Sequence, residues 1–251
     1  MDTTTIFILI IVFIATLIRS TFGFGESLVA VPLLLLIIPI EIVVPLSVLL
    51  SIFIAAVVVV QDHAQIHFSS AKWLIIFALP GIPLGLIILV YGNEHYVKSA
   101  LAFLIILYSI YSLSGKQKIV LQKDNRFWLF ICGFFSGVFG GAYGLNGPPL
   151  VVYGNMRNWS SKHFRATLQA YFLPASIIGM FGYWYKGLWI NTVTYYFLIS
   201  LPVIIPAIFL GRYLNHRLKG NSFFNYVYIG LILIGLILIV QSLPSSLILE
   251  P

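Results

Sequence analysis

Residues 141–149 read GAYGLNGPP, and this stretch interrupts a chain that is otherwise strongly apolar. Three glycines and two adjacent prolines disfavour a continuous helix, because glycine is conformationally free and proline lacks the amide hydrogen that a helix uses. In hydrocarbon, each backbone polar group without a partner costs several kcal/mol. The stretch therefore predicts a site where protein or a polar cavity surrounds bare backbone groups.

The composition is that of an integral membrane protein. Of 251 residues, 60% are hydrophobic and 8% are charged, whereas soluble domains carry about 25% charged residues. Apolar runs such as 6–18, 43–60 and 73–90 approach the ~20 residues that cross a bilayer. They are continuous and do not alternate in polarity as membrane β-strands do, so they predict helices. No Lys or Arg precedes the first run, which favours a retained helix over a cleaved signal peptide.

A polar stretch divides the chain into two similar halves. We predict a first transmembrane repeat over 1–113, a cytoplasmic linker over 114–126 and a second transmembrane repeat over 127–251. FGFGESLVAVP, from Phe22 to Pro32, aligns with FGGAYGLNGPP, from Phe139 to Pro149. Each half contains five apolar segments: 5–19, 27–39, 42–60, 72–91 and 97–113 in the first, and 127–139, 148–156, 163–183, 191–210 and 222–241 in the second.

An odd number of segments makes the second half enter the membrane from the opposite side. This inverted-repeat arrangement is common in secondary transporters. With the linker in the cytoplasm, most basic residues of the short loops fall inside, as the positive-inside rule requires. Loop placement, and not a nucleic-acid partner, thus explains the net charge of +7. We expect an all-α polytopic protein of the inner membrane with both termini external.

The first two segments of each half are short for membrane crossings. Residues 148–156 with their prolines rise only about 15 Å at 1.5 Å per residue. Each pair either crosses twice or dips to mid-membrane as a re-entrant hairpin. We favour hairpins that enter from opposite sides, so that their tips approach. The helix after the second tip then points free amide N–H groups and a partial positive charge into the cavity, as anion sites do.

Two stretches carry a resemblance to a known family. GFGESLVAVPLLLL (residues 23–36) and GFFSGVFGGAYGLNGPPLVVY (residues 133–153), followed by the R-A-T of 165–167, resemble the repeat signatures of the TauE/SafE family of sulfite and organosulfonate exporters. The resemblance implies an inverted-repeat carrier that exports small sulfur oxyanions such as sulfite or sulfoacetate. The chain departs from the family at the first tip, where Glu26 stands in place of the small residues that members often carry.

The candidate substrate ligands gather at the two tips. The amide of Asn146 either donates to a sulfonate oxygen or caps the following helix, and the hydroxyl of Ser27 has the same two alternatives. Tyr143 either offers its hydroxyl to the cavity or packs the tip. The full set of tip candidates is Gly23, Gly25, Ser27, Gly141, Tyr143, Gly144, Asn146 and Gly147.

Charged and hydroxyl residues near the tips complete the predicted site. Glu26 is either a proton carrier coupled to anion movement, because burial favours the neutral carboxyl group, or the ion-pair partner of Arg19. Arg165, matched to the family motif, either attracts the anion at the cytoplasmic mouth or only sets topology. Gln169 lies one helical turn further on the same face. Three hydroxyl residues either line the cavity or bond their own helix backbone: Ser47, Ser51 and Thr167.

Catalytic and metal-binding functions find less support. The chain has no Walker-type phosphate-binding motif and no Ser–His–Asp or paired-carboxylate pattern, so we predict a protein that is not an enzyme. The single cysteine, Cys132, lies in an apolar segment as a core residue would. His63 and His67 have the spacing of half a metal site, but only Asp62 accompanies them. We therefore predict no metal and no cofactor.

The predicted function is thus a secondary carrier whose partners are a small anion and the lipid bilayer. The competing functions are an anion channel, a proton-coupled uptake carrier for a small anion and, with least support, a membrane-embedded enzyme. The small size of the chain also suggests a homodimer.

Overall fold

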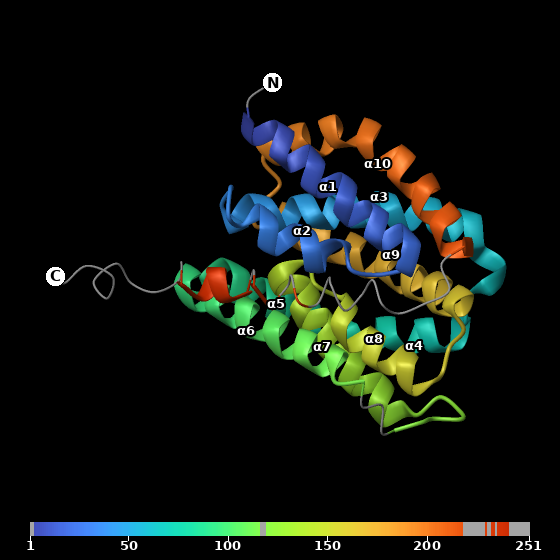
Figure 1. The fold of residues 1–251 in the computed structure, drawn as a ribbon. Coiled ribbons are helices and arrows are strands. Elements are labelled where there is room, and N and C mark those ends of the chain that lie inside the picture. Colours follow the sequence, from blue (N-terminus) through green and yellow to red (C-terminus); the bar gives the residue numbers. More distant parts are fainter. Residues whose placement is uncertain (1–2, 116–118, 218–228, 230–231, 234, 241–251) are drawn as a thin grey trace. The chain divides into compact units, whose positions relative to one another are not determined.

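The fold comes from a computed structural model of the 251-residue chain. It describes all residues except 1–2, 116–118, 218–228, 230–231, 234 and 241–251 (Figure 1). The described residues form α-helices joined by short loops, with one 3₁₀ turn, η1 (His63–Gln65). The helices are α1 (Thr3–Phe22), α2 (Glu26–Leu34), α3 (Ile40–Asp62), α4 (Phe68–Ala78), α5 (Gly81–Tyr91), α6 (Glu94–Leu113), α7 (Arg126–Tyr143), α8 (Gly147–Met156), α9 (Ser161–Tyr185) and α10 (Asn191–Arg217).

The predicted helical class is confirmed, and nine of the ten predicted segments correspond to these helices. The tenth, 222–241, lies largely outside the described residues, although the described positions within 229–240 are helical. Five described helices are long and apolar enough to cross a membrane, or six if α4 and α5 form one bent span. The protein is therefore a multi-pass membrane protein.

Two expectations about segment length are wrong. The first segments of the halves are not short, because α1 has 20 residues and α7 has 18, and both are long and apolar enough to cross a membrane. The polar residues that made these runs look short, such as Arg19, are satisfied inside the protein. Only α2 and α8, with nine and ten residues, remain too short to cross alone.

The segment predicted over 72–91 is broken into α4 and α5, which meet at an angle of 45°. Pro80 stands between them. Proline removes one intrahelical hydrogen bond and its ring clashes with the preceding turn, which accounts for the bend. Helix α10 contains Pro202 and Pro206 and continues through both.

Most of the described helices belong to one compact unit, which contains the breaks between α1 and α2 and between α7 and α8. This unit comprises Met1–Val90 and Gln117–Leu218, and a second unit comprises Tyr91–Lys116 and Lys219–Pro251. In the first unit, α1 packs along α10, α4 packs along α7, and α3 packs along α9 (Figure 1). The short helices α2 and α8 pack mainly on α1 and α7, respectively. The units do not coincide with the two halves, since α6 of the first half lies in the second unit.

Glycines allow α7 to approach α4 and α5 closely. Gly133, Gly137 and Gly141 recur every four residues on one face of α7. A Cβ atom at Gly137 would collide with the carbonyl oxygen of Ala78, and one at Gly141 with that of Ile82. Membrane helices use such small-residue stripes to bring their backbones together. This contact holds the helix before the second tip against the bend between α4 and α5.

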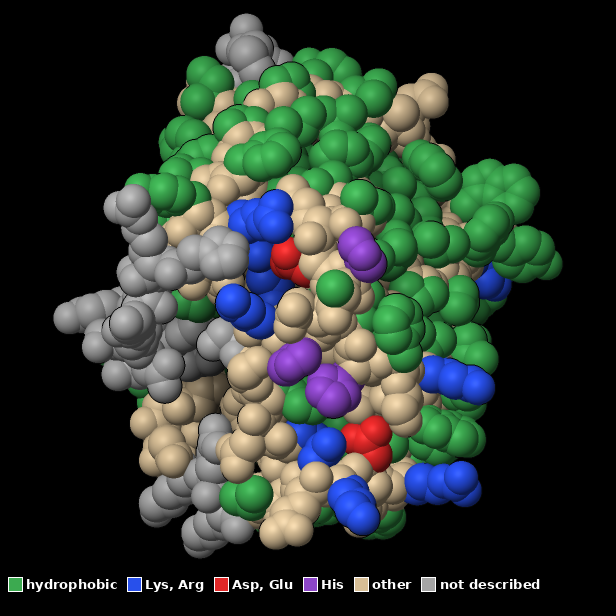
Figure 2. Space-filling model, turned by 90° about the vertical axis from the view of Figure 1, so that its right-hand side faces the viewer, with side chains coloured by type: hydrophobic (Ala, Val, Ile, Leu, Met, Phe, Trp, Pro, Cys, Tyr) green, Lys and Arg blue, Asp and Glu red, His purple; other side chains and the backbone are tan. Residues whose placement is uncertain are grey.

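Large apolar side chains cover the outside of the helices, as expected for surfaces that contact lipid. Phe7, Phe181 and Phe209 are more than half exposed. The space-filling view shows hydrophobic side chains over much of one face, with the charged side chains gathered in a band (Figure 2).

Candidate functional site

The two predicted tips lie next to each other. The first tip, residues 23–25, connects α1 to α2, and the second, residues 144–146, connects α7 to α8. Both line one small pocket: Phe24, Gly25, Glu26, Ser27 and Leu28 from the first half, and Gly144, Leu145, Asn146, Gly147 and Pro148 from the second. The tips of the two halves therefore meet, as the sequence predicted.

Glycine conformation explains both breaks. Gly23 and Gly25 have φ angles of 89° and 100°, and Gly144 has a φ angle of 67°, values that side chains with a Cβ atom disfavour. Helix α7 ends where the N–H of Gly144 donates to the carbonyl oxygen of Gly140 at 2.9 Å. Helix α8 begins with Pro148 and Pro149 in its first turn, where the missing amide hydrogen has no helical acceptor to lose.

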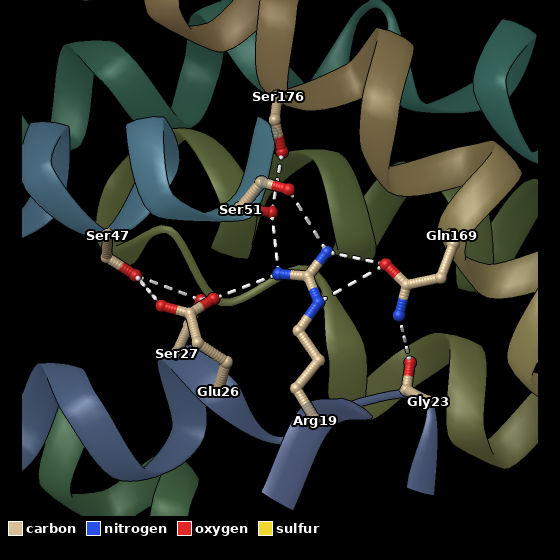
Figure 3. Close-up of polar contacts among 8 residues, drawn as sticks. All are labelled: Arg19, Gly23, Glu26, Ser27, Ser47, Ser51, Gln169 and Ser176. Carbon is tan, nitrogen blue, oxygen red and sulfur yellow. Dashed lines mark hydrogen bonds and ion pairs between the residues drawn. The ribbon is translucent and has the colours of Figure 1, made fainter. Parts of the chain in front are cut away.

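A buried arginine occupies the centre of the site (Figure 3). The side chain of Arg19 is 3% exposed. Its Nη1 donates to Glu26 Oε2 at 2.9 Å and to Ser51 Oγ at 2.8 Å. Its Nε and Nη2 donate to Gln169 Oε1 at 3.2 and 2.8 Å. The guanidinium also lies 4.8 Å from the ring centre of Phe172, so a cation–π contact supplements its hydrogen bonds.

Glu26 is the counter-ion of this arginine. Its carboxylate is 1% exposed and accepts hydrogen bonds from the hydroxyls of Ser27 and Ser47, each at 3.1 Å. Glu26 is the first residue of α2, where the positive end of the helix dipole also favours a negative charge. The predicted alternative in which Glu26 pairs with Arg19 is realised in this structure.

The same arrangement ties the first tip to α9. Gln169 Nε2 donates to the carbonyl oxygen of Gly23 at 2.9 Å while Gln169 Oε1 accepts from Arg19. The amide thus satisfies one bare backbone group of the broken segment, as backbone at membrane depth requires. Gln169 supports Arg19 and does not itself line the pocket.

The pocket is narrow in this conformation. The space open to the centres of water-sized molecules is about 20 Å³, and one water needs roughly 10–15 Å³ of such space. An anion with several oxygen atoms therefore needs a wider pocket. The Glu26 carboxylate occupies one end of the Arg19 guanidinium.

Several predicted ligands line the pocket. Gly25, Ser27, Gly144, Asn146 and Gly147 do so. Asn146 precedes α8 but makes no side-chain cap to that helix. Its Oδ1 is buried and has no hydrogen-bond partner among the described residues, so the structure does not use Asn146 for capping.

Other predicted tip residues lie beside the pocket. The carbonyl oxygen of Gly141 accepts from the hydroxyl of Tyr183 at 2.8 Å, and Gly141 packs against α5. Tyr143 is buried and does not line the pocket. Gly23 contributes through the carbonyl oxygen held by Gln169.

Arg165 lies in a different pocket. Its side chain is 2% exposed, and Nη1 forms an ion pair with Asp62 at 3.1 Å. Among the three hydroxyl residues, Ser51 lines the tip pocket and Ser47 binds Glu26. Thr167 instead accepts from the backbone N–H of His67 at 3.0 Å.

Sequence reasoning missed two contributors from α9. Phe172 lines the pocket, and Ser176 Oγ lies 3.1 Å from Ser51 Oγ. Both follow Gln169 at helical spacing, seven residues after it for Ser176 and three for Phe172. This i, i+3, i+7 pattern marks one face of a helix and was the available signal.

The histidines make aromatic contacts. His67 stacks on Trp159 with ring centres 5.9 Å apart and lies 5.0 Å from His163. No group of three or more His, Cys, Asp or Glu with metal-site geometry occurs among the described residues. Cys132 is buried in α7, as predicted.

A buried charged pocket where broken helices of two halves meet is typical of membrane transporters. The sequence profile of the family described as "Sulfite exporter TauE/SafE" matches residues 8–238, and the chain belongs to this family. It is also similar to a "Probable sulfite/organosulfonate exporter TauE" from Cupriavidus necator, with 27% identity over 137 residues. That match covers 53% of each protein, about half the length of the relative. No solved structure is significantly similar to the chain.

Proposed function

We propose that this protein is a secondary transporter that exports a small sulfur oxyanion, such as sulfite or a sulfonate like sulfoacetate, across the inner membrane by alternating access. Membership of the TauE/SafE family supports this proposal, as does the printed name of the C. necator relative. The observation that carries it is the meeting of both glycine tips around Arg19. A planar guanidinium with several N–H donors suits the oxygens of a sulfonate or sulfite group.

In the proposed cycle, the anion replaces the Glu26 carboxylate on Arg19. A second negative charge in this buried site would be costly unless Glu26 became neutral. Protonation of Glu26 releases Arg19 and keeps the occupied site near electrical neutrality. The amide Nδ2 of Asn146 and the hydroxyl of Ser27, both from residues that line the pocket, then supply further N–H and O–H donors to the anion.

The packing of the helices supports an inverted repeat. The first helix of each half packs on the fourth segment of the other half, α1 on α10 and α7 on α4. The third helices, α3 and α9, pack on each other. A two-fold axis that relates the halves would produce these reciprocal contacts. In secondary transporters, halves related in this way rock about a binding site between them.

The proposed orientation places the linker in the cytoplasm and both termini outside. A membrane potential that is negative inside then drives an anion outward with about 2.3 kcal/mol per charge per 100 mV, provided that the proton on Glu26 returns to the cytoplasmic side and does not cross with the anion. Export is therefore feasible without ATP. Lipid and the small anion are the proposed partners, and a homodimer remains part of the proposal.

A proton-coupled uptake carrier is the second candidate, because Glu26 is buried beside Arg19. In that case a proton on Glu26 would travel inward with the anion and offset its charge. The two candidates share the site and differ in direction and coupling.

Counterflow in liposomes tests the proposal. Purified protein is reconstituted into vesicles loaded with unlabelled sulfite, and the entry of ³⁵S-sulfite is followed with sulfoacetate, taurine and sulfate as competitors. We expect saturable exchange that Arg19→Lys reduces at least about tenfold, because lysine lacks the planar fork. Arg157→Lys is the matched control, since Arg157 pairs with Asp124 outside the pocket.

The same assay separates the alternatives. A channel gives flux without trans-stimulation, and a proton-coupled carrier gives flux that a pH gradient drives. Absence of exchange for every sulfur anion, together with transport of another solute class, would refute the proposed substrate.

A further inference from the structure

A second pocket lies where α3, η1, α9 and α10 come together. Its walls include Asp62, His63, Lys162, Arg165, Arg212 and Asn215. The space open to the centres of water-sized molecules is about 240 Å³, compared with about 20 Å³ at the tips. This pocket shares no lining residue with the tip pocket.

Arg165 is the unusual residue of this pocket. Its side chain is 2% exposed, and Nη1 binds Asp62 at 3.1 Å. Its Nε and Nη2 are buried and have no hydrogen-bond partner in the part of the chain that the structure describes. Buried charged donors without acceptors are costly, and buried polar groups in proteins are nearly always satisfied. Arg165 therefore has two donors for which the described residues provide no acceptor.

The charge of the pocket indicates the nature of that acceptor. Arg212 Nη2 lies 3.5 Å from Asp62 Oδ1, so Asp62 is shared by two arginines. Lys162 also lines the pocket, and Asp62 is the acidic residue in its wall. Three basic side chains and one carboxylate thus line the described wall of this pocket. Figure 2 shows basic side chains gathered around an acidic side chain on one face of the molecule.

We propose that this pocket is a second binding site, for a small oxyanion such as sulfite, sulfonate, sulfate or phosphate, in which Asp62 competes with the anion for Arg165 and Arg212. Two oxygens of the anion accept hydrogen bonds from Nε and Nη2 of Arg165. Their spacing matches the two parallel N–H groups on that edge of the guanidinium. The polar lining, with Gln61 and Gln65 beside the charged residues, suits a free solute. A lipid headgroup would present the same chemistry but needs an apolar wall for its chains.

The pocket also has a route to the tips. Arg165, Gln169, Phe172 and Ser176 follow one another at spacings of four, three and four residues in α9, so they share one face of the helix. Gln169 holds Arg19, and the backbone of Arg165 packs against Gly23. If the proposed transport function holds, the pocket faces the cytoplasm and collects the anion before it reaches Arg19.

Equilibrium binding of ³⁵S-sulfite to the purified full chain in a neutral detergent tests the site. We expect Arg212→Gln to weaken one class of sulfite site about tenfold. Asp62→Asn should tighten the same class several-fold, because both arginines lose their internal competitor; misfolding cannot produce tighter binding. Arg157→Gln, which breaks an ion pair with Asp124 elsewhere, should leave sulfite binding unchanged.

Competitors identify the source of the oxyanion. Displacement of bound sulfite by phosphate and sulfate, but not by phosphatidylglycerol in mixed micelles, supports a free solute. Displacement by phosphatidylglycerol alone would overturn that assignment in favour of a headgroup. Sulfite binding that neither Arg212→Gln nor Asp62→Asn alters would overturn the site itself.

The outcome is separable from the transport proposal. Binding that depends on Arg212 without counterflow of any sulfur anion would retain the second site and refute the transport function. Counterflow of sulfite, together with binding that neither Arg212→Gln nor Asp62→Asn changes, would retain the transport function and refute the second site.

Discussion

A buried guanidinium needs an anion, and Glu26 meets this need for Arg19 in the present conformation. Both charges are almost completely removed from water, where breaking a pair by removing one partner typically costs about 3–5 kcal/mol. The pair is therefore well suited to a site that exchanges one anion for another. The Ser51 hydroxyl and the Gln169 amide hold Arg19 in place, and they would continue to do so during the proposed exchange.

Glu26→Gln should expose this dependence. Without ligand, the variant keeps a hydrogen-bond acceptor for Arg19 but loses the negative charge, so we expect the free energy of unfolding to fall by about 3 kcal/mol. Sulfite should restore stability more strongly than in the unmodified protein, because binding to the folded state stabilises it. Thermal unfolding followed by tryptophan fluorescence, with and without sulfite, measures both effects.

The control is Glu94→Gln, which removes an exposed i, i+4 partner of Lys98. Such surface pairs contribute roughly 0–1 kcal/mol. A Glu26→Gln protein as stable as this control, with no added response to sulfite, would show that the pair does not hold the anion position.

The sign of the pH dependence follows from the same exchange. Low pH protonates Glu26 and frees Arg19, so anion affinity at the tip should rise as pH falls. In Glu26→Gln this dependence should largely disappear, because the amide does not titrate. Titration of ³⁵S-sulfite binding between pH 6 and 8.5 tests this, with sulfoacetate as a second ligand since its sulfonate stays ionised throughout. Affinity that rises with pH for both ligands would contradict the proposed role of Glu26.

The sequence predicted much of this residue-level picture. Glycine conformations and the polar side chains next to them placed Ser27, Glu26 and Asn146 at the tips, and the structure puts all three in one pocket. Phe172 and Ser176 share a helix face with Gln169, but this spacing is a weak signal, because an aromatic ring and a hydroxyl in a membrane helix have many ordinary uses. Only the position of Arg19 beside α9 makes them part of the site.

At the scale of elements, close packing of α7 positions the second tip. The glycine stripe of α7 lets its backbone touch α4 and α5, and the helix then runs on to Tyr143 before it ends at Gly144. The hydroxyl of Tyr183 binds the carbonyl oxygens of Gly140 and Gly141 at this end. The location of the tip thus depends on contacts with helices distant in sequence.

Gly137→Ala should disturb this contact. The added methyl group would collide with the backbone of Ala78, so we expect a loss of about 1–3 kcal/mol in the free energy of unfolding. Gly179→Ala is the matched control in α9, because a Cβ atom there meets nothing within 4 Å. Alanine favours a helix over glycine by up to about 1 kcal/mol, so the control should be neutral or more stable. Equal melting temperatures for the two variants would contradict the packing argument.

Apolar runs predicted the helices well but not their ends or bends. Helices α1 and α7 extend past their predicted ends. In α1, Arg19 finds hydrogen-bond partners inside the protein, and in α7 the glycines pack closely against neighbouring helices. The run over 72–91 contains two prolines, Pro80 and Pro83, but these alone did not predict the 45° bend, because α10 shows that proline need not break a helix. Tertiary contacts decide between these outcomes.

At the scale of the whole molecule, the central feature is that both halves contribute to one charged pocket. Repeats in the sequence pointed to this meeting, because each half carries a broken segment at the corresponding place. The exchange of packing partners between the halves offers a way to open the pocket on either side by moving one set of helices against the other. The narrowness of the pocket means that an anion with several oxygen atoms would fit only after the pocket widens.

The most direct measurement is counterflow of sulfite before and after a disulfide joins the two tips. A Cβ atom at Gly147 would lie 3.9 Å from Cβ of Phe24, within the usual disulfide range of about 3.5–4.5 Å. In a Cys132→Ala background, which removes the single native cysteine, the pair Phe24→Cys and Gly147→Cys should cross-link under mild oxidation. We expect the cross-link to abolish counterflow and reduction to restore it. Failure to cross-link, or full counterflow with the tips joined, would contradict a carrier built on two tips that meet around Arg19.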